Sequence, residues 1–160
     1  MHQLLEHVFL GQYSYKRSIS SPRMSLDGTA CFEQNQANQI LYREQGSYTL
    51  GEIEQTCYQK QTFIVTKSNL YIYKNALQLL HEFTLGTMPG FPVKLTHTHL
   101  CKNDRYALEM VIHSFNNFST SYRVQGPSKN YNIHTIFRRI QKDQRDDDVD
   151  DQGRERRRSL

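Results

Sequence analysis

The sequence predicts an all-β domain, an antiparallel up-and-down β-barrel of about 8–10 strands with one short N-terminal helix. Three observations lead to this fold class. From Gln12 onward, apolar and polar residues alternate with a period of two, in a stretch rich in Tyr, Phe, Ile, Val and Thr. Short polar turn sequences interrupt this alternation. No segment after residue 11 has helical periodicity, so the crossover connections of a parallel sheet are not expected.

The N-terminal helix is predicted over residues 2–10. Leu4, Leu5, Val8 and Phe9 recur at the spacing of one helical face, and Gly11 is suited to end the helix. A helix this short holds only when it packs against the rest of the domain.

Candidate strands fill the remainder of the domain. Turn sequences separate them at 36–38, 67–69, 102–103, 116–117 and 126–128. The strands are expected over 13–20, 25–34, 39–50, 52–59, 62–66, 70–74, 78–85, 93–101, 105–115, 119–125 and 129–140.

A closed barrel is favoured over a sandwich because the strands keep one apolar face and one polar face over long stretches. Leu108, Met110 and Ile112 follow Tyr106 on the apolar face of one candidate strand. Closing such a meander removes its exposed edges, and a barrel of this size has an interior that can hold one small ligand.

One domain is expected over residues 1–140, followed by a disordered charged tail over 141–160. The tail has an acidic run, 146–151, an Arg-rich run, 154–158, and few apolar residues to offset the entropy of ordering. The net charge of +4 is moderate, so nucleic acid is not expected as a partner. The sequence does not indicate an oligomeric state.

Composition also suggests a cellular compartment. Cys31, Cys57 and Cys101 form neither a CxxC pair nor a disulfide framework, and no apolar run approaches the ~20 residues of a membrane span. The N-terminus has no secretory signal pattern, because Glu6 and His7 interrupt its apolar residues. We therefore expect a cytoplasmic protein with reduced thiols.

His97, His99 and Cys101 alternate along one candidate strand and should share a face. Such a pair of histidines can ligate a transition metal or haem, with Asp104 or His81 as a further metal ligand. The alternative, which we favour, is that the histidines form hydrogen bonds inside the barrel, with no cofactor.

Several further polar residues are candidates for contact with a ligand. Arg43 and Glu44 are adjacent on a strand, so one of them should point into the barrel, and an inward Arg43 would suit a ligand carboxylate or phosphate. Asp104 follows a turn and could orient His99 as a general base, although no nucleophile motif accompanies it. Tyr106, Lys129 and Tyr131 complete the candidate ligand-binding set.

Four segments resemble, in order and spacing, the pattern of the domain of unknown function 6314 family: Gly28-Thr29-Ala30-Cys31-Phe32, Leu41-Tyr42-Arg43-Glu44-Gln45-Gly46, His99-Leu100-Cys101-Lys102-Asn103-Asp104-Arg105-Tyr106 and Val124-Gln125-Gly126-Pro127-Ser128-Lys129-Asn130-Tyr131. The resemblance covers roughly 10–139 and implies a calycin-like, lipocalin-like barrel with no assigned activity. It also implies that an aromatic residue of the first strand packs on an arginine of the last, which here would join Tyr13 to Arg138 or Arg139. The family usually has tryptophan where this chain has Tyr13.

The leading functional hypothesis is a non-enzymatic module that binds a small apolar or amphipathic ligand, oriented by Arg43, His99 and Tyr106. A second hypothesis is an enzyme or cofactor carrier that uses His97 and His99 as metal ligands, or His99 as a base. A third is a protein-interaction or nucleic-acid module that works through the basic body and the tail.

Overall fold

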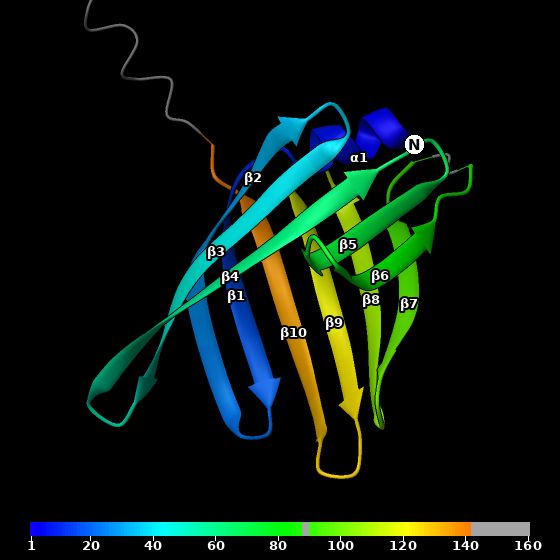
Figure 1. Cartoon of the computed structure of the whole chain (residues 1–160). Coiled ribbons are helices and arrows are strands. Elements are labelled where there is room, and N and C mark those ends of the chain that lie inside the picture. The colour runs from blue at the N-terminus through cyan, green and yellow to red at the C-terminus, as the bar shows by residue number, and fades with distance from the viewer. Residues whose placement is uncertain (88–89, 142–160) are drawn as a thin grey trace, which may run out of the picture.

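The computed structural model describes residues 1–87 and 90–141 and contains ten strands and one helix (Figure 1). The elements are α1 (His2–Phe9), β1 (Gly11–Ser20), β2 (Arg23–Gln36), β3 (Gln39–Leu50), β4 (Ile53–Val65), β5 (Asn69–Asn75), β6 (Gln78–Thr84), β7 (Val93–Cys101), β8 (Asp104–Ser114), β9 (Asn117–Gln125) and β10 (Asn130–Arg139). The charged tail predicted over 141–160 lies, from residue 142 on, outside the described residues.

All ten strands belong to one antiparallel sheet with the order β6-β5-β4-β3-β2-β1-β10-β9-β8-β7. From β1 to β6 and from β7 to β10 each strand pairs with the next in sequence, and β1 pairs with β10, so the connections are those of an up-and-down barrel. The predicted fold class is confirmed.

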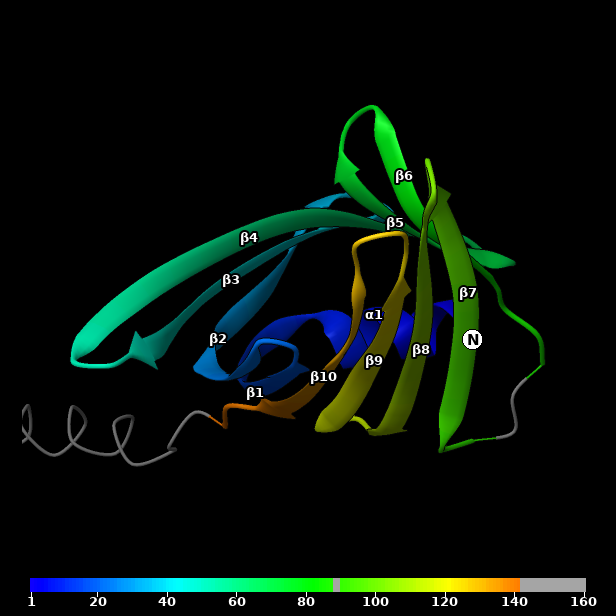
Figure 2. The same cartoon turned by 90° about the horizontal axis from the view of Figure 1, so that it is seen from below.

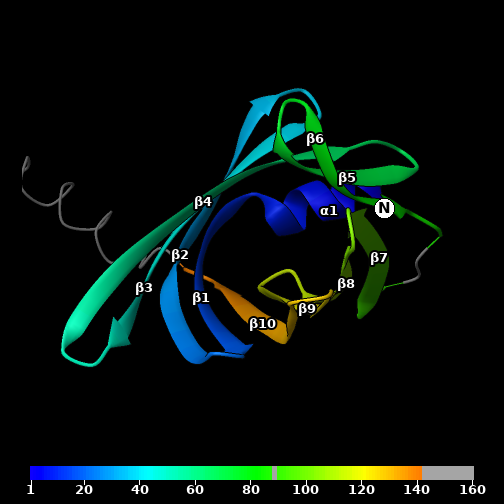
Figure 3. The same cartoon turned by 60° about the horizontal axis from the view of Figure 1, so that its bottom comes forward.

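The barrel is nearly closed. β6 and β7 are the two ends of the sheet, and no backbone ladder joins them. Figure 3 shows the strands curving around a central space, with β6 and β7 facing one another. We call the junction between these two strands the seam.

The predicted strands at 52–59 and 62–66 form a single strand, β4, in the structure. Lys60 and Gln61 between them keep the extended conformation because β3 pairs with β4 without interruption from Gln39 to Leu50. The turn predicted at 116–117 lies one residue earlier, because a register shift after Ile112 leads to pairing of Ser114 with Asn117.

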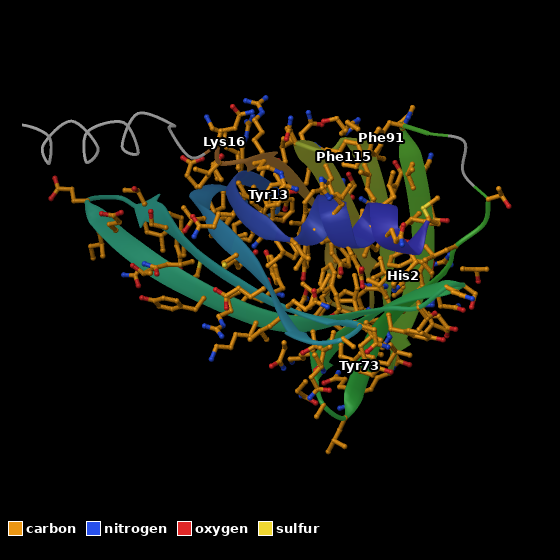
Figure 4. All side chains as sticks on the ribbon, turned by 90° about the horizontal axis from the view of Figure 1, so that it is seen from above. His2, Tyr13, Lys16, Tyr73, Phe91 and Phe115 are labelled. Atoms are coloured by element: carbon orange, nitrogen blue, oxygen red, sulfur yellow. The ribbon has the colours of Figure 1, made fainter. Side chains whose placement is uncertain are left out.

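Helix α1 closes one end of the barrel (Figure 4). Leu5, Val8 and Phe9 are fully buried. The ring of Phe9 packs edge-on against Phe63 at 5.3 Å and Phe118 at 5.6 Å between centroids. Burying a side chain of this size contributes about 1.5–3 kcal/mol, which is how so short a helix is held.

Two glycines leave room for a tyrosine ring inside the barrel. Gly28 and Gly46 face each other on β2 and β3, and Tyr15 of β1 faces Gly28. A Cβ atom on Gly46 would lie 2.0 Å from the Tyr15 hydroxyl, and one on Gly28 would lie 2.2 Å from the Gln45 carbonyl. The inner wall at this level therefore requires glycine on both strands.

Within residues 1–87 and 90–141, no helix has the length and apolarity needed to cross a membrane.

Candidate functional site

The interior of the barrel contains a cavity of about 590 Å³. It begins below the aromatic cluster under α1, where Phe32, Phe63, Phe118 and Phe137 line it. It extends to the opposite end of the barrel, where Tyr106 and Tyr131 line it, and it also reaches the free edge of β4 at Tyr58, which is 73 % exposed. The cavity is therefore closed by the helix at one end and borders solvent at the other.

A charged pair lies in the middle of the cavity wall. Arg17 of β1 donates two hydrogen bonds to the carboxylate of Glu44 on β3, at 2.6 and 2.8 Å, and a third to Thr135 of β10 at 2.9 Å. The hydroxyl of Tyr42 also donates to Glu44. Glu44 is 6 % exposed, so its charge depends on its two partners, Arg17 and Tyr42.

The electrostatics of this cluster follow from its burial. Burial disfavours the charged guanidinium, but the hydrogen bonds and charge of Glu44 outweigh it and raise the pKa of Arg17. Burial, with the nearby Glu44 carboxylate, raises the pKa of Tyr15 to about 12 and that of Tyr42 well above its ordinary value. Arg17 is thus charged, and both tyrosines are neutral, throughout the physiological range.

Histidines meet at the seam. Nδ1 of His81 on β6 lies 3.0 Å from Nδ1 of His97 on β7, and Nε2 of His81 lies 2.9 Å from the hydroxyl of Tyr122 on β9. His99 is also near, with its ring centroid 6.2 Å from that of His81. Burial, with the neighbouring His97 and His99, lowers the pKa of His81 to about 3, so this ring is neutral.

Five of the six predicted ligand-binding residues gather at the end of the barrel away from the helix. Tyr106 and Tyr131 line the cavity. Lys129 donates hydrogen bonds to Asp104 at 2.8 Å and to the hydroxyl of Tyr106 at 2.9 Å, and these bonds raise the pKa of Lys129. His99 lines the cavity beside Tyr106, with 6.3 Å between ring centroids.

The prediction that Arg43 points into the barrel is wrong. Arg43 lies on the outer face, where its side chain is 54 % exposed and 4.0 Å from Glu33. The neighbouring Glu44 is the inward charge, because alternate residues of β3 face opposite sides of the sheet. The inward guanidinium belongs to Arg17, which was not among the residues predicted from the sequence.

The predicted metal ligands do not converge. His97, His99 and Cys101 alternate along β7 as expected, but His97 is engaged with His81 and Cys101 is exposed. Among the residues described, no group of three or more His, Cys, Asp or Glu side chains is placed to hold a metal ion. Asp104, the other suggested ligand, is bonded to Lys129 instead.

Tyr13 packs on Arg139, one of the two arginines that the family resemblance implied. The guanidinium carbon of Arg139 lies 4.9 Å from the Tyr13 ring centroid. Arg139 also donates to the carbonyls of Leu10 at 2.6 Å and Val8 at 2.8 Å, and so ties the end of α1 to the last strand. Arg138 is exposed on the outer face.

The cavity is also lined by three residues that were not predicted from the sequence, Arg17, Tyr42 and Thr135. A signal for Arg17 was present, since it is four residues after Tyr13 on the same strand and therefore shares its inward face. Thr135 carries no such signal, because threonine is common on both faces of a strand.

Comparison with known proteins agrees with this architecture. A family model described as a family of unknown function, DUF6314, matches residues 9–139. No curated protein sequence matches the chain. The S-type phycobiliprotein lyase CPES from Guillardia theta has a similar structure, with a TM-score of 0.66 and 7 % identity over 88 % of this chain and 93 % of that one. The structure of EF1p2_mFAP2b bound to DFHBI has a TM-score of 0.51 and 10 % identity over 88 % of this chain and 99 % of that one. At these identities the similarity shows the fold alone, a small calycin-like barrel.

Proposed function

The chain belongs to the DUF6314 family of unknown function, and from that premise we propose that its barrel binds one small amphipathic molecule in the central cavity. The observation that carries the proposal is the cavity itself. Its volume of about 590 Å³ is in the range of small-molecule sites, and its walls are mainly aromatic and aliphatic, with charged, amide, hydroxyl and imidazole side chains among them.

The arrangement of the lining supports a particular orientation for the ligand. The apolar part would lie next to Phe32, Phe118 and Phe137, below the helix. Polar atoms of the ligand would face His99, Tyr106 and Tyr131, which lie near the open end and can exchange hydrogen bonds with it. A known barrel of the same fold, EF1p2_mFAP2b, has DFHBI bound, which supports the fold's suitability for such a ligand.

The Arg17–Glu44 pair restricts the chemistry of the ligand. The pair is neutral as a unit, and Glu44 already uses both carboxylate oxygens. A ligand anion that sought Arg17 would have to displace a buried carboxylate and leave it without its partner, which costs several kcal/mol. We therefore propose a ligand that is uncharged in the part that reaches this level of the barrel.

The first experiment is native mass spectrometry of the gently purified protein, to detect a co-purified organic molecule. The second measures binding of the amphipathic dye 1-anilinonaphthalene-8-sulfonate to the wild type and to two variants with substitutions on the same strand, β10. Ile133 lines the cavity, whereas Ile136 is 39 % exposed. Ile133→Trp fills the cavity and should weaken binding at least about tenfold, while Ile136→Trp should bind as the wild type does.

Near-ultraviolet circular dichroism of both variants checks that the dye reports the cavity and not a loosened fold. The proposal would be overturned by a folded protein that carries no adduct and binds no dye. It would also be overturned if Ile133→Trp and Ile136→Trp bound the dye with equal affinity.

A further inference from the structure

β4 is much longer than the strand beside it. β5 pairs with β4 only from Thr62 to Val65. Along residues 53–61, the edge of β4 that faces away from β3 is therefore not paired with any strand that the structure describes. β3 in turn pairs with β2 no further than Ser47. The hairpin of residues 48–55 therefore extends beyond the barrel wall, as Figures 1 and 2 show, and the free edge of β4 continues from it along the wall through residue 61. We call residues 48–61 the arm.

The direction of the backbone groups along the arm follows from hydrogen bonds at its base. The N–H of Val65 donates to Asn38 on the β3 side, and the N–H of Thr66 donates to Asn69 on the β5 side. The register between β3 and β4 has no bulge, so this alternation continues to the tip. Even-numbered residues therefore turn their N–H and C=O groups to the free edge: Glu54, Thr56, Tyr58 and Lys60.

The charges along this edge are complementary to those of the same edge in a second copy that runs in the opposite direction. If two arms pair antiparallel about Cys57, Glu54 of each lies directly opposite Lys60 of the other, and Thr56 lies opposite Tyr58. All four even-numbered residues then form hydrogen-bonded pairs. Within its own chain Lys60 faces Arg43, a like charge, and neither Glu54 nor Lys60 forms an ion pair with any residue that the structure describes.

From the free edge and this charge pattern, we infer that two copies of the chain associate through their arms by antiparallel pairing of β4 with β4, centred on Cys57. A lysine on an exposed edge ordinarily discourages pairing with other strands. Here an acid at the matching position favours one partner, a second copy, in one register.

The shape of the arm is compatible with this dimer. Each arm points away from its own barrel (Figure 2), and antiparallel pairing places the two barrels at opposite ends of the joined arms. The pairing also covers part of Tyr58, which is 73 % exposed, and Ile53, which is 62 % exposed. Cys57 would face its own copy in a non-hydrogen-bonded pair, with the two Cα atoms about 4.5 Å apart.

Sedimentation velocity of charge variants tests the inference. Lys60→Glu places Glu54 opposite a glutamate, and Glu54→Lys places a lysine opposite Lys60, so each variant should associate at least about tenfold more weakly than the wild type. A mixture of the two variants restores both attractive pairs and should give a 1:1 heterodimer. Both residues are exposed, so the variants should fold, which circular dichroism checks.

Cross-linking with a short bis-maleimide tests the register. The double variant Cys31→Ser/Cys101→Ser, with Cys57 as its one thiol, should cross-link to a dimer, and Cys57→Ser should not. A wild type that sediments as a monomer up to its solubility limit would overturn the inference. So would a dimer that the charge reversals leave unchanged, or one that cross-links equally without Cys57.

Discussion

The Nδ1 atoms of His81 and His97 lie 3.0 Å apart across the seam, where no backbone ladder joins β6 to β7. His81 is also hydrogen-bonded to Tyr122, so one buried imidazole links three strands. If Tyr122 donates to Nε2 of His81, then Nδ1–H of His81 donates to His97, and all three groups are satisfied in their neutral forms. The seam is therefore held in part by a contact that requires His81 to be uncharged.

The stability of the barrel should fall in acid because of this contact. His81 has a pKa of about 3 in the folded chain against an ordinary value of 6.5, so the unfolded chain binds one more proton between these limits. The free energy of unfolding should fall by up to about 1.4 kcal/mol per pH unit as the pH drops through this window. Burial also lowers the pKa of His97, so its protonation likewise reduces the free energy of unfolding in acid. His81→Gln, which cannot be protonated, should flatten the dependence, as measured by urea unfolding from pH 7 to pH 4.

A histidine away from the seam provides the control. His134 is exposed on the outer face of β10, where it contacts Ser121, and His134→Gln should keep the acid dependence of the wild type. Equal slopes for His81→Gln and the wild type would show that the seam does not carry the effect.

The sequence predicted the fold because its strongest signals are local. Alternation of apolar residues defines strands such as β8, where Tyr106, Leu108, Met110 and Ile112 all point inward as expected. Strand ends were less predictable. The break expected near Lys60 is absent, because uninterrupted pairing with β3 keeps the backbone extended there.

The site was predicted only in part. His99, Tyr106 and Tyr131 line the cavity as their alternation suggested, but the choice of Arg43 over Glu44 depended on which face of β3 is inside. A single strand cannot decide this, because the side-chain period is two and a shift of one residue inverts every assignment. The contact of His81 with His97 joins the two ends of the sheet, which no local pattern reveals.

Arg139 should contribute far more to the stability of the fold than its neighbour Arg138. Its guanidinium lies over Tyr13 and donates to the carbonyls of His7, Val8, Leu10 and Phe115, whereas Arg138 points to solvent. Arg139→Met should lower the free energy of unfolding by about 2–4 kcal/mol and speed hydrogen exchange in α1. Arg138→Met should change it by less than about 0.5 kcal/mol. Equal losses would mean that the helix is held by apolar packing alone.

Loss of the hydroxyl should have opposite effects on stability at Tyr15 and at Tyr42. The Tyr15 hydroxyl is buried without a hydrogen-bond partner among the residues described, whereas that of Tyr42 donates to Glu44. Tyr15→Phe removes an unsatisfied polar group and should leave stability unchanged or raise it by about 1 kcal/mol. Tyr42→Phe should cost about 1.5–3 kcal/mol, because the lost bond is to a charged group. Chemical denaturation of both variants tests the contrast, and a loss for Tyr15→Phe would reveal a partner for its hydroxyl.

Arg17 and Glu44 should behave as a unit. Arg17→Met leaves the Glu44 carboxylate buried with only the hydroxyl of Tyr42, and should cost about 3–5 kcal/mol. Adding Glu44→Met removes the stranded charge, and because apolar pairs of similar volume commonly replace buried ion pairs without loss, the double variant should recover most of that stability. A double-variant cycle by urea unfolding measures the coupling. If the losses in the free energy of unfolding of the two single variants simply add, the interaction between Arg17 and Glu44 contributes no stability. A ligand anion could then bind to Arg17 directly.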